Sequence, residues 1–340
     1  MKATLKMIAQ ALGVHPSTVS RALSGKPGVS EEMRAKIISL AQEMGYLPDS
    51  RARSLRQGHT KIIGIVIPDM GNPFFSQAVS AMEKVLFPLE YSFFLCVTEE
   101  DSEKEKVLLE NLVSYKVDGI LAAPVDRVKN TKLYKEVQKR GIPVIFFDRR
   151  LVTIETPYAV IDNRGAVTTI VDYLWKKGHR TLGVITLHRE SYTGMERLEA
   201  AIERAKELKI EIKPDWIKDG MSTETGAYKA ALELFKGSEL PTALFVCNNV
   251  MALGVLRALK ELKVKVPEDM SLVTFDDSFW NQIFEPPVTC VAQDPEQLGM
   301  IAATMMLNRI RYPEKKLEGV VLKTRFIERA SVKDLTKARG

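Results

Sequence analysis

The chain has 340 residues, of which 45% are hydrophobic, and a mean hydropathy of -0.08, values typical of a globular protein with more than one domain. No run of about 18 apolar residues occurs, so we expect neither a membrane span nor a membrane partner. The first residues lack the apolar stretch of a signal peptide, and we expect a cytoplasmic location. The cysteines (Cys96, Cys247 and Cys290) and the four histidines show no ligand spacing, which predicts no disulfide, metal or cofactor.

The positive charge of the chain is concentrated at its N-terminus. The first 60 residues contain nine Lys or Arg and four Asp or Glu, a balance of +5, whereas the whole chain carries +6. The residues from 61 onward are therefore close to neutral. A local positive field of this kind attracts a polyanion. We expect double-stranded DNA to bind this end of the chain.

The N-terminal residues predict three short helices. Thr4 can cap a helix over residues 5–12, and Pro16 suits the first turn of a second helix over 16–23. Ser30, followed by two acidic residues, opens a third helix. Apolar side chains recur at helical spacing in each segment. This pattern is typical of an all-α helix-turn-helix domain, whose second helix enters the major groove of DNA.

Polar side chains on the second helix are placed to contact DNA. Arg21 can donate two hydrogen bonds to guanine, worth about 1–3 kcal/mol of discrimination, and Ser17 can serve either kind of base edge. Contacts to phosphates add affinity without reading sequence. The predicted contacts in this part of the chain are Thr4, Ser17, Thr18, Arg21, Ser30 and Arg34. The alternative, a surface bundle of helices with an ordinary polar face, explains neither the tight turn nor the one-sided charge.

The stretch from 5 to 25 resembles the DNA-binding domain of the lactose-repressor (LacI/GalR) family, and residues 45–49 and 52–56 continue the similarity. Two departures stand out. Met7 replaces an acid that is usual in the family, and His15-Pro16 stands where small polar residues are more common. Since a proline ring cannot hydrogen-bond a base, the operator preference of a relative does not transfer to this chain.

The resemblance also implies a hinge over residues 49–60. In the family this segment orders as a short helix on operator DNA and pairs with its dimer mate. Leu55 would then wedge into the minor groove, and Arg51, Arg53 and Arg56 would hold the flanking phosphates. The alternative is a flexible basic linker, which so short an isolated segment favours in the absence of DNA.

From residue 61 onward, apolar strands alternate with amphipathic helices, the pattern of parallel α/β domains. Two successive groups of strands predict a bilobed α/β domain, with a cleft at the carboxyl ends of the strands. The expected strands are 62–67, 93–97, 119–122 and 144–147 in the first group and 182–185, 243–246 and 272–275 in the second.

The resemblance extends over this region, which is similar to periplasmic-binding-protein-like, sugar-binding domains, and it implies a division of the chain into three parts. The expected parts are a helix-turn-helix domain over 1–48, the hinge over 49–60, and a bilobed effector-binding and dimerisation domain over 61–340. The N-subdomain is expected at about 61–160 and 292–322, and the C-subdomain at about 161–291 and 323–340.

Polar and aromatic side chains follow the predicted strands. Carboxylates, amides and guanidinium groups beside aromatic faces suit a polyhydroxylated ligand. The candidate effector-binding residues are Asn72, Phe74, Phe75, Asp148, Arg149, Arg197, Asn249 and Asp276. Each residue taken singly could be a loop cap or a surface residue, but their joint placement at strand ends favours a pocket.

Two features leave the identity of the effector open. Asn249 replaces an aspartate that usually follows Asn248 in the family, and the loop over 187–192 is short and unusual. An aromatic cluster after Asp277 has two interpretations that we weigh equally: one ring could stack on a ligand, or the cluster could fill a loop between the lobes. Its members are Phe279, Trp280 and Phe284.

These features predict a sequence-specific transcriptional regulator, a repressor, that binds a palindromic operator as a homodimer, with a tetramer as an alternative. A small-molecule effector, a carbohydrate, would control it from the interlobe cleft. The second hypothesis is a sugar-type solute-binding protein, which the helix-turn-helix disfavours. The third is an enzyme, but no catalytic residues are expected, because no Gly-rich phosphate loop, Cys-His pair or metal cluster occurs.

Overall fold

The computed structural model describes residues 3–46 and 59–336. The chain divides into two compact units, Met1–Thr60 and Lys61–Gly340, which are taken separately below. No helix within the described ranges combines the length and the apolar character needed to cross a membrane.

The first unit contains the three helices expected from the sequence: α1 (Leu5–Ala11), α2 (Pro16–Leu23) and α3 (Glu31–Glu43). A side chain accepts a hydrogen bond at the start of each helix, which satisfies a backbone N–H that the helix cannot. Gly13, with a φ of +65°, makes the turn between α1 and α2. The helices bury a small shared core of Ile8, Ala9, Val19, Ala22, Ile37 and Ala41.

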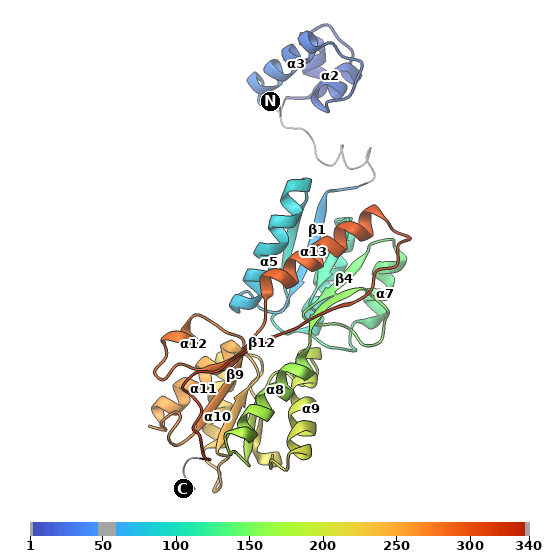
Figure 1. Ribbon diagram of the computed structural model, residues 1–340. Helices are drawn as coiled ribbons and strands as arrows, with labels where there is room; N and C mark the ends of the chain where they lie inside the picture. Colours follow the sequence, from blue (N-terminus) through green and yellow to red (C-terminus); the bar gives the residue numbers. More distant parts are fainter. Residues whose placement is uncertain (1–2, 47–58, 337–340) are drawn as a thin grey trace. The chain divides into compact units, whose positions relative to one another are not determined.

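The first lobe of the second unit, here called the N-lobe, is built on a six-stranded parallel sheet in the order β11-β5-β4-β3-β1-β2. The strands are β1 (Ile62–Ile67), β2 (Ser92–Val97), β3 (Gly119–Ala122), β4 (Val144–Phe147), β5 (Tyr158–Ile161) and β11 (Val320–Leu322). Helices α5 (Pro73–Leu86) and α13 (Pro295–Arg311) cover one face, and α6 (Ser102–Ser114) and α7 (Thr131–Lys139) cover the other (Figure 1).

The second lobe, here called the C-lobe, has a six-stranded sheet in the order β12-β10-β9-β8-β6-β7, parallel except that β12 runs antiparallel to β10. The strands are β6 (Leu182–Thr186), β7 (Ile217–Asp219), β8 (Ala243–Val246), β9 (Ser271–Phe275), β10 (Thr289–Ala292) and β12 (Arg325–Ile327). The main helices are α8 (Asn163–Lys176), α9 (Tyr192–Glu207), α10 (Glu224–Leu234) and α11 (Asn249–Glu261), and a short helix, α12 (Trp280–Ile283), follows β9. All four main helices contribute to a single buried core.

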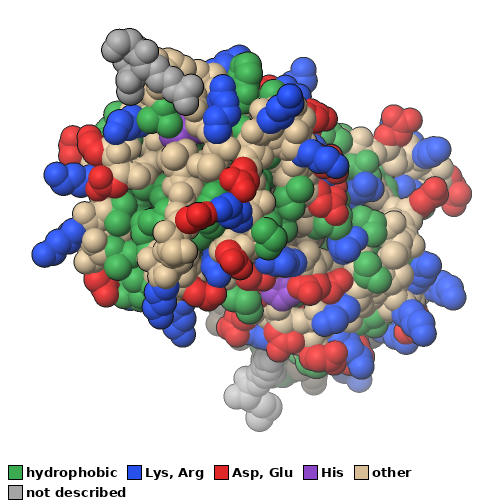
Figure 2. Space-filling view, turned by 90° about the horizontal axis from the view of Figure 1, so that it is seen from below, with side chains coloured by type: hydrophobic (Ala, Val, Ile, Leu, Met, Phe, Trp, Pro, Cys, Tyr) green, Lys and Arg blue, Asp and Glu red, His purple; other side chains and the backbone are tan. Residues whose placement is uncertain are grey.

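The chain passes between the lobes three times: after β5, after β10 and after β11. Figure 1 shows the resulting arrangement, in which α13 returns to the N-lobe beside α5. The bilobed α/β fold expected from the sequence is confirmed, and each of the seven expected strands is present to within one residue at either end. The sequence analysis did not predict helix α13 or the strands β5, β7, β10, β11 and β12. In Figure 2, acidic and basic side chains are interspersed over the face in view, in keeping with a nearly neutral second unit.

Candidate DNA interface and effector cleft

The N-terminus of α2 is held by a histidine. The Nδ1 atom of His15 accepts the backbone N–H of Ser17 at 3.3 Å and lies 2.8 Å from the Ser17 hydroxyl oxygen. Because the backbone N–H can only donate, Nδ1 is unprotonated in this arrangement, and the neutral ring carries its hydrogen on Nε2. Ser17, a predicted base reader, is therefore oriented by its neighbour, a role that sequence reasoning did not assign to His15.

Arg21 and Arg34 have different surroundings although both were predicted to contact DNA. Arg21 is exposed, and its guanidinium makes no hydrogen bond or ion pair among the described residues. The Arg34 guanidinium donates to the carbonyls of Ala22 at 2.9 Å and Lys26 at 2.8 Å, at the end of α2. Arg34 thus ties α3 to the end of the recognition helix, and its predicted phosphate contact stays a prediction.

The remaining DNA-contact predictions fall into two groups. Thr4 and Ser30 are exposed and act as helix caps, accepting the backbone N–H groups of Met7 and Met33 at 3.3 Å, while Thr18 is half-buried on α2. The hinge predictions lie outside the described residues: Arg51, Arg53, Leu55 and Arg56.

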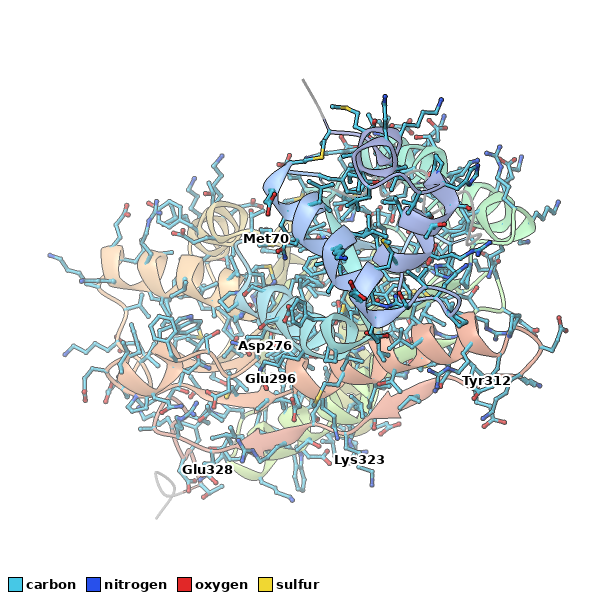
Figure 3. The ribbon with its side chains drawn as sticks, turned by 90° about the horizontal axis from the view of Figure 1, so that it is seen from above. Met70, Asp276, Glu296, Tyr312, Lys323 and Glu328 are labelled. Carbon is cyan, nitrogen blue, oxygen red and sulfur yellow. The ribbon has the colours of Figure 1, made fainter. Side chains whose placement is uncertain are left out.

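Two aspartates mark the carboxyl ends of central strands, one in each lobe. Asp148 directly follows β4 and Asp276 directly follows β9, and both are buried. Both have left-handed backbone conformations, with φ of 59° and 71°, a strained state that clusters at functional sites. Burial raises the pKa of Asp148 to about 6, against the opposing charges of Arg149 and Arg197, and the nearby Asp276 charge raises it further. Asp276 is labelled among the side chains of the second unit in Figure 3.

Arg197 extends from α9 into the C-lobe side of the cleft. Its Nε donates to the Asn163 amide oxygen at 2.8 Å, and its Nη1 donates to the Cys247 carbonyl at 2.6 Å. The guanidinium carbon lies 3.5 Å from the centre of the Phe275 ring, a cation–π contact. Burial lowers the pKa of Arg197, and the charge of Asp276 opposes this shift.

Arg149 forms a buried pair with Glu100. Its two terminal nitrogens each donate to a different carboxylate oxygen of Glu100 at 2.7 Å. Burial alone would raise the pKa of Glu100, but the charge and hydrogen bonds of Arg149 bring it below its ordinary value. A hydrogen bond from Ser222, in the C-lobe, lowers the pKa of Glu100 as well. Glu100 was not among the predicted site residues.

A hydrogen bond between amides joins the lobes on another side of the cleft. The Asn249 amide nitrogen donates to the Asn72 amide oxygen at 3.1 Å and to the Ser278 hydroxyl at 3.0 Å. Asn72 also caps α5 by accepting the backbone N–H of Phe74 at 3.0 Å. Phe74 and Phe75 pack into the N-lobe core with an edge-to-face ring contact of 5.1 Å.

Three further polar or charged residues line the cleft, Gln293, Asn163 and Arg150. None of them was among the predicted effector-binding residues. The Gln293 amide nitrogen donates to the carboxylate of Asp276. Asn163 orients Arg197, and the Arg150 guanidinium lies 4.5 Å from the ring centre of Tyr158 and 5.4 Å from that of Tyr192. Gln293 directly follows β10, so recognising that strand would have revealed it.

The aromatic cluster after Asp277 separates into two kinds of residue. Trp280 and Phe284 pack against the C-lobe core, which favours the loop-packing interpretation for both. Phe279 is one of the most exposed large apolar side chains. A separate open groove of about 820 Å³ lies beside β12, and it includes none of the predicted effector residues. Within the described ranges, no group of three or more His, Cys, Asp or Glu side chains could hold a metal ion.

Comparison with known proteins identifies the family of this chain. Residues 4–49 match the bacterial regulatory proteins of the lacI family, and residues 171–332 match the periplasmic binding protein-like domain. The HTH-type transcriptional repressor PurR of Proteus mirabilis (strain HI4320) is 32% identical over 98% of this chain and 97% of its own length. The chain belongs to the lacI family of bacterial regulatory proteins. The family resemblance predicted from the N-terminal motifs is confirmed.

Solved structures of lacI-family regulators agree with this assignment. The lac repressor dimer bound to operator and the anti-inducer ONPF superposes with a TM-score of 0.85 over 98% of this chain and 100% of that chain, at 22% identity, which supports the fold. A transcriptional regulator CelR–cellobiose complex is 27% identical, with a TM-score of 0.73 over 97% of this chain and 100% of that chain. A LacI family regulator from Enterococcus faecium with bound ribose is 26% identical, with a TM-score of 0.71 over 81% of this chain and 99% of that chain.

Proposed function

We propose that this lacI-family protein is a transcriptional repressor that binds a palindromic operator as a homodimer and is controlled by an uncharged, carbohydrate-type effector in the interlobe cleft. Relatives that share about a third of its sequence along their full length are named as repressors. The helix-turn-helix match over residues 4–49 argues against the alternative of a solute-binding protein.

The placement of Asp148 and Asp276 carries the effector proposal. Each lobe presents one buried, strained aspartate at the end of a central strand, and the two carboxylates are close enough for one charge to influence the pKa of the other. The closest charged partner of Asp148 is Arg149 Nε, at 3.7 Å, which is longer than a hydrogen bond. A ligand rich in hydroxyl donors would satisfy both carboxylates and hold the lobes together.

Two regulators with the same fold support a carbohydrate, since their structures contain cellobiose and ribose. Effector binding would change how the lobes meet, and this change would bias the DNA-binding units of a dimer toward or away from the operator. Because the two binding events share one conformational equilibrium, the effector and DNA must alter each other's affinity by the same factor.

The test is an operator titration with carbohydrates added. An operator obtained by selection from random DNA is titrated by fluorescence anisotropy with and without D-ribose, D-glucose and cellobiose. We expect at least one sugar to change the operator Kd by about 5-fold or more, within the usual range of allosteric coupling. If every sugar leaves the operator Kd unchanged, the carbohydrate assignment is wrong.

Matched substitutions connect this response to the cleft. Asp276→Asn should abolish the effect of the active sugar, because it removes the buried carboxylate but keeps the side-chain size. Asp215→Asn makes the same chemical change on the exposed surface of the C-lobe and should keep the response.

The homodimer has its own support and test. Two recognition helices related by a two-fold axis match a palindromic operator, and a relative with the same fold was solved as a dimer on its operator. Sedimentation equilibrium should give twice the chain mass of 38.2 kDa. A monomer at micromolar concentration would contradict the dimer.

A further inference from the structure

Glu100 is the most unusual polar residue in the cleft. It follows β2 in a left-handed conformation, with a φ of 59°, and only 14% of its side chain is exposed. Both carboxylate oxygens are used by Arg149, whose own side chain is 4% exposed. The preceding residue, Glu99, is exposed and forms an ion pair with Lys104 at 3.1 Å.

Residues of the C-lobe lie beside Glu100. Ser222 helps to lower the pKa of the Glu100 carboxylate, and the Ser222 hydroxyl accepts the backbone N–H of His188 at 3.2 Å. Beside this contact, the backbone N–H of Arg127 in the N-lobe donates to the carbonyl of Glu190 at 3.0 Å. The Glu100 carboxylate therefore lies where the two lobes approach each other, and it cannot leave Arg149 without breaking both of their hydrogen bonds.

The two terminal nitrogens of Arg149 are consequently already occupied by the protein itself. A planar guanidinium that donates two parallel hydrogen bonds is the usual partner of a phosphate or carboxylate ligand. Glu100 takes this pair of bonds on Arg149, and Asn163 together with the Cys247 carbonyl takes two donors of Arg197. The third arginine, Arg150, packs over tyrosine rings.

We propose that Glu100 determines the charge specificity of the cleft, acting as a built-in anion that occupies the Arg149 guanidinium and so excludes phosphorylated and carboxylated ligands. The cleft then accepts uncharged, hydroxyl-rich molecules through Asp148 and Asp276. This inference rests on the proposed function only in placing the effector in this cleft.

The physical reason for the exclusion is the cost of an unpaired buried charge. A ligand phosphate that displaced Glu100 from Arg149 would leave a buried carboxylate without its partner. A phosphate that did not displace it would face three carboxylates, those of Glu100, Asp148 and Asp276. We expect a sugar phosphate to bind at least about 30-fold more weakly than the sugar itself.

The experiment measures ligand binding to the full-length protein by isothermal titration calorimetry and thermal shift. The probes are D-ribose, D-glucose, ribose 5-phosphate, glucose 6-phosphate and inorganic phosphate. In the wild type, each sugar phosphate should bind the cleft at least about 30-fold more weakly than its parent sugar. Glu100→Ala should gain binding of at least one of them, by about 10-fold or more, because it frees the Arg149 guanidinium and opens space beside it.

Two controls locate the gained binding. Glu99→Ala removes a neighbouring carboxylate that is exposed and should gain nothing, which separates cleft binding from phosphate binding at the basic N-terminal unit. Adding Arg149→Met to Glu100→Ala should remove the gain. If Glu100→Ala does not fold, Glu100→Gln removes the charge and keeps the size.

The proposal is overturned if the wild type binds a sugar phosphate as tightly as its parent sugar. It is also overturned if folded Glu100→Ala or Glu100→Gln gains no phosphate binding, or if Glu99→Ala gains as much. The two proposals fail in different experiments. If the proposed function is wrong, no sugar alters the operator affinity. Phosphate binding by the Glu100 variants is measured without DNA and tests the charge specificity alone.

Discussion

Arginine is used in opposite ways in the two units of this protein. Arg21 on the recognition helix is exposed, and its guanidinium makes no hydrogen bond or ion pair with the part of the chain that the structure describes. Arg149 and Arg197 in the cleft are 4% and 3% exposed, and each donates two hydrogen bonds within the protein. An exposed guanidinium keeps its donors for an external anion, whereas a buried one costs folding free energy unless groups of the protein pair with its charge.

The comparison teaches that an arginine in a predicted site does not by itself indicate an anionic ligand. Whether its guanidinium is available to a ligand depends on its partners within the chain. Arg34 shows the same point inside the helical unit, because carbonyls at the end of α2 accept its hydrogen bonds. The following predictions test this distinction between free and internally paired groups.

The largest expected effect is on the buried pair. Arg149→Met leaves the Glu100 carboxylate buried without its partner and should lower the free energy of unfolding by about 3–5 kcal/mol. Combining Arg149→Met with Glu100→Gln should recover most of this loss, because neither remaining group is charged. Urea unfolding of the second unit, followed by tryptophan fluorescence, measures both. Equal losses in the single and double variants would show that the pair is not coupled.

Asp148, by contrast, lies 3.7 Å from its closest charged partner, Arg149 Nε, which is beyond hydrogen-bond distance. Its pH dependence should therefore have the opposite sign from that of the hydrogen-bonded carboxylate of Glu100. Burial raises its pKa from 3.8 to about 6, so between these pH values the folded protein holds a proton that the unfolded chain has lost. Stability contributed by this group therefore falls as pH rises from about 4 to 6, by about 3 kcal/mol in total.

Asp148→Asn removes this penalty. The variant should be more stable than the wild type at pH 7 and equally stable near pH 4, as measured by urea unfolding at a series of pH values. Asp215→Asn, on the exposed surface, provides the control and should follow the wild-type profile. A wild-type slope that persists in Asp148→Asn would mean that another group titrates in this range.

Some residues of the cleft can be predicted from the sequence and others cannot, and the difference has a physical reason. Asp148 and Asp276 directly follow uninterrupted apolar strands, so their position at a sheet edge can be read from the chain. Glu100 lies in the run Glu99-Glu100-Asp101, which is typical of a solvated surface. Only the approach of Ser222 and Arg149 in three dimensions buries the second glutamate and leaves the first exposed.

The fold shows the same division. Long apolar strands such as β1 can be predicted from the sequence, because burial on both faces of a sheet requires continuous hydrophobic residues. The strands β11 and β12 have three residues each and lie in polar surroundings, and they pair with strands more than 30 residues earlier in the chain. These strands form only because the chain crosses between the lobes, and a local sequence pattern does not predict such crossings.

A smaller effect is expected when the free arginine is removed. Arg21→Ala should weaken binding to the selected operator by about 1–3 kcal/mol, which is roughly 5- to 150-fold in Kd, and should relax the preference at one base pair. The helical unit should remain as stable as before. Selection from random DNA, repeated with the variant, measures the change, and an unaltered preference would exclude Arg21 as a base reader.

Arg34→Ala is the matched control, because it removes an arginine that is internally bonded. It should increase amide hydrogen exchange at the end of α2, where the Ala22 and Lys26 carbonyls lose their donor. The preferred operator sequence should stay the same. If Arg34→Ala changed base preference and left exchange unaltered, the roles of the two arginines would be reversed.

The smallest effect is expected at the cap of the recognition helix. His15→Ser keeps a side-chain acceptor for the Ser17 N–H and should change stability by less than about 0.5 kcal/mol, whereas His15→Ala removes the acceptor and should cost about 1 kcal/mol. Amide exchange at Ser17 and Thr18 reports the cap directly. If His15→Ser lowered operator affinity while preserving exchange protection, the ring itself would contact DNA through Nε2–H, and His15 would join Arg21 as a group left free for an external partner.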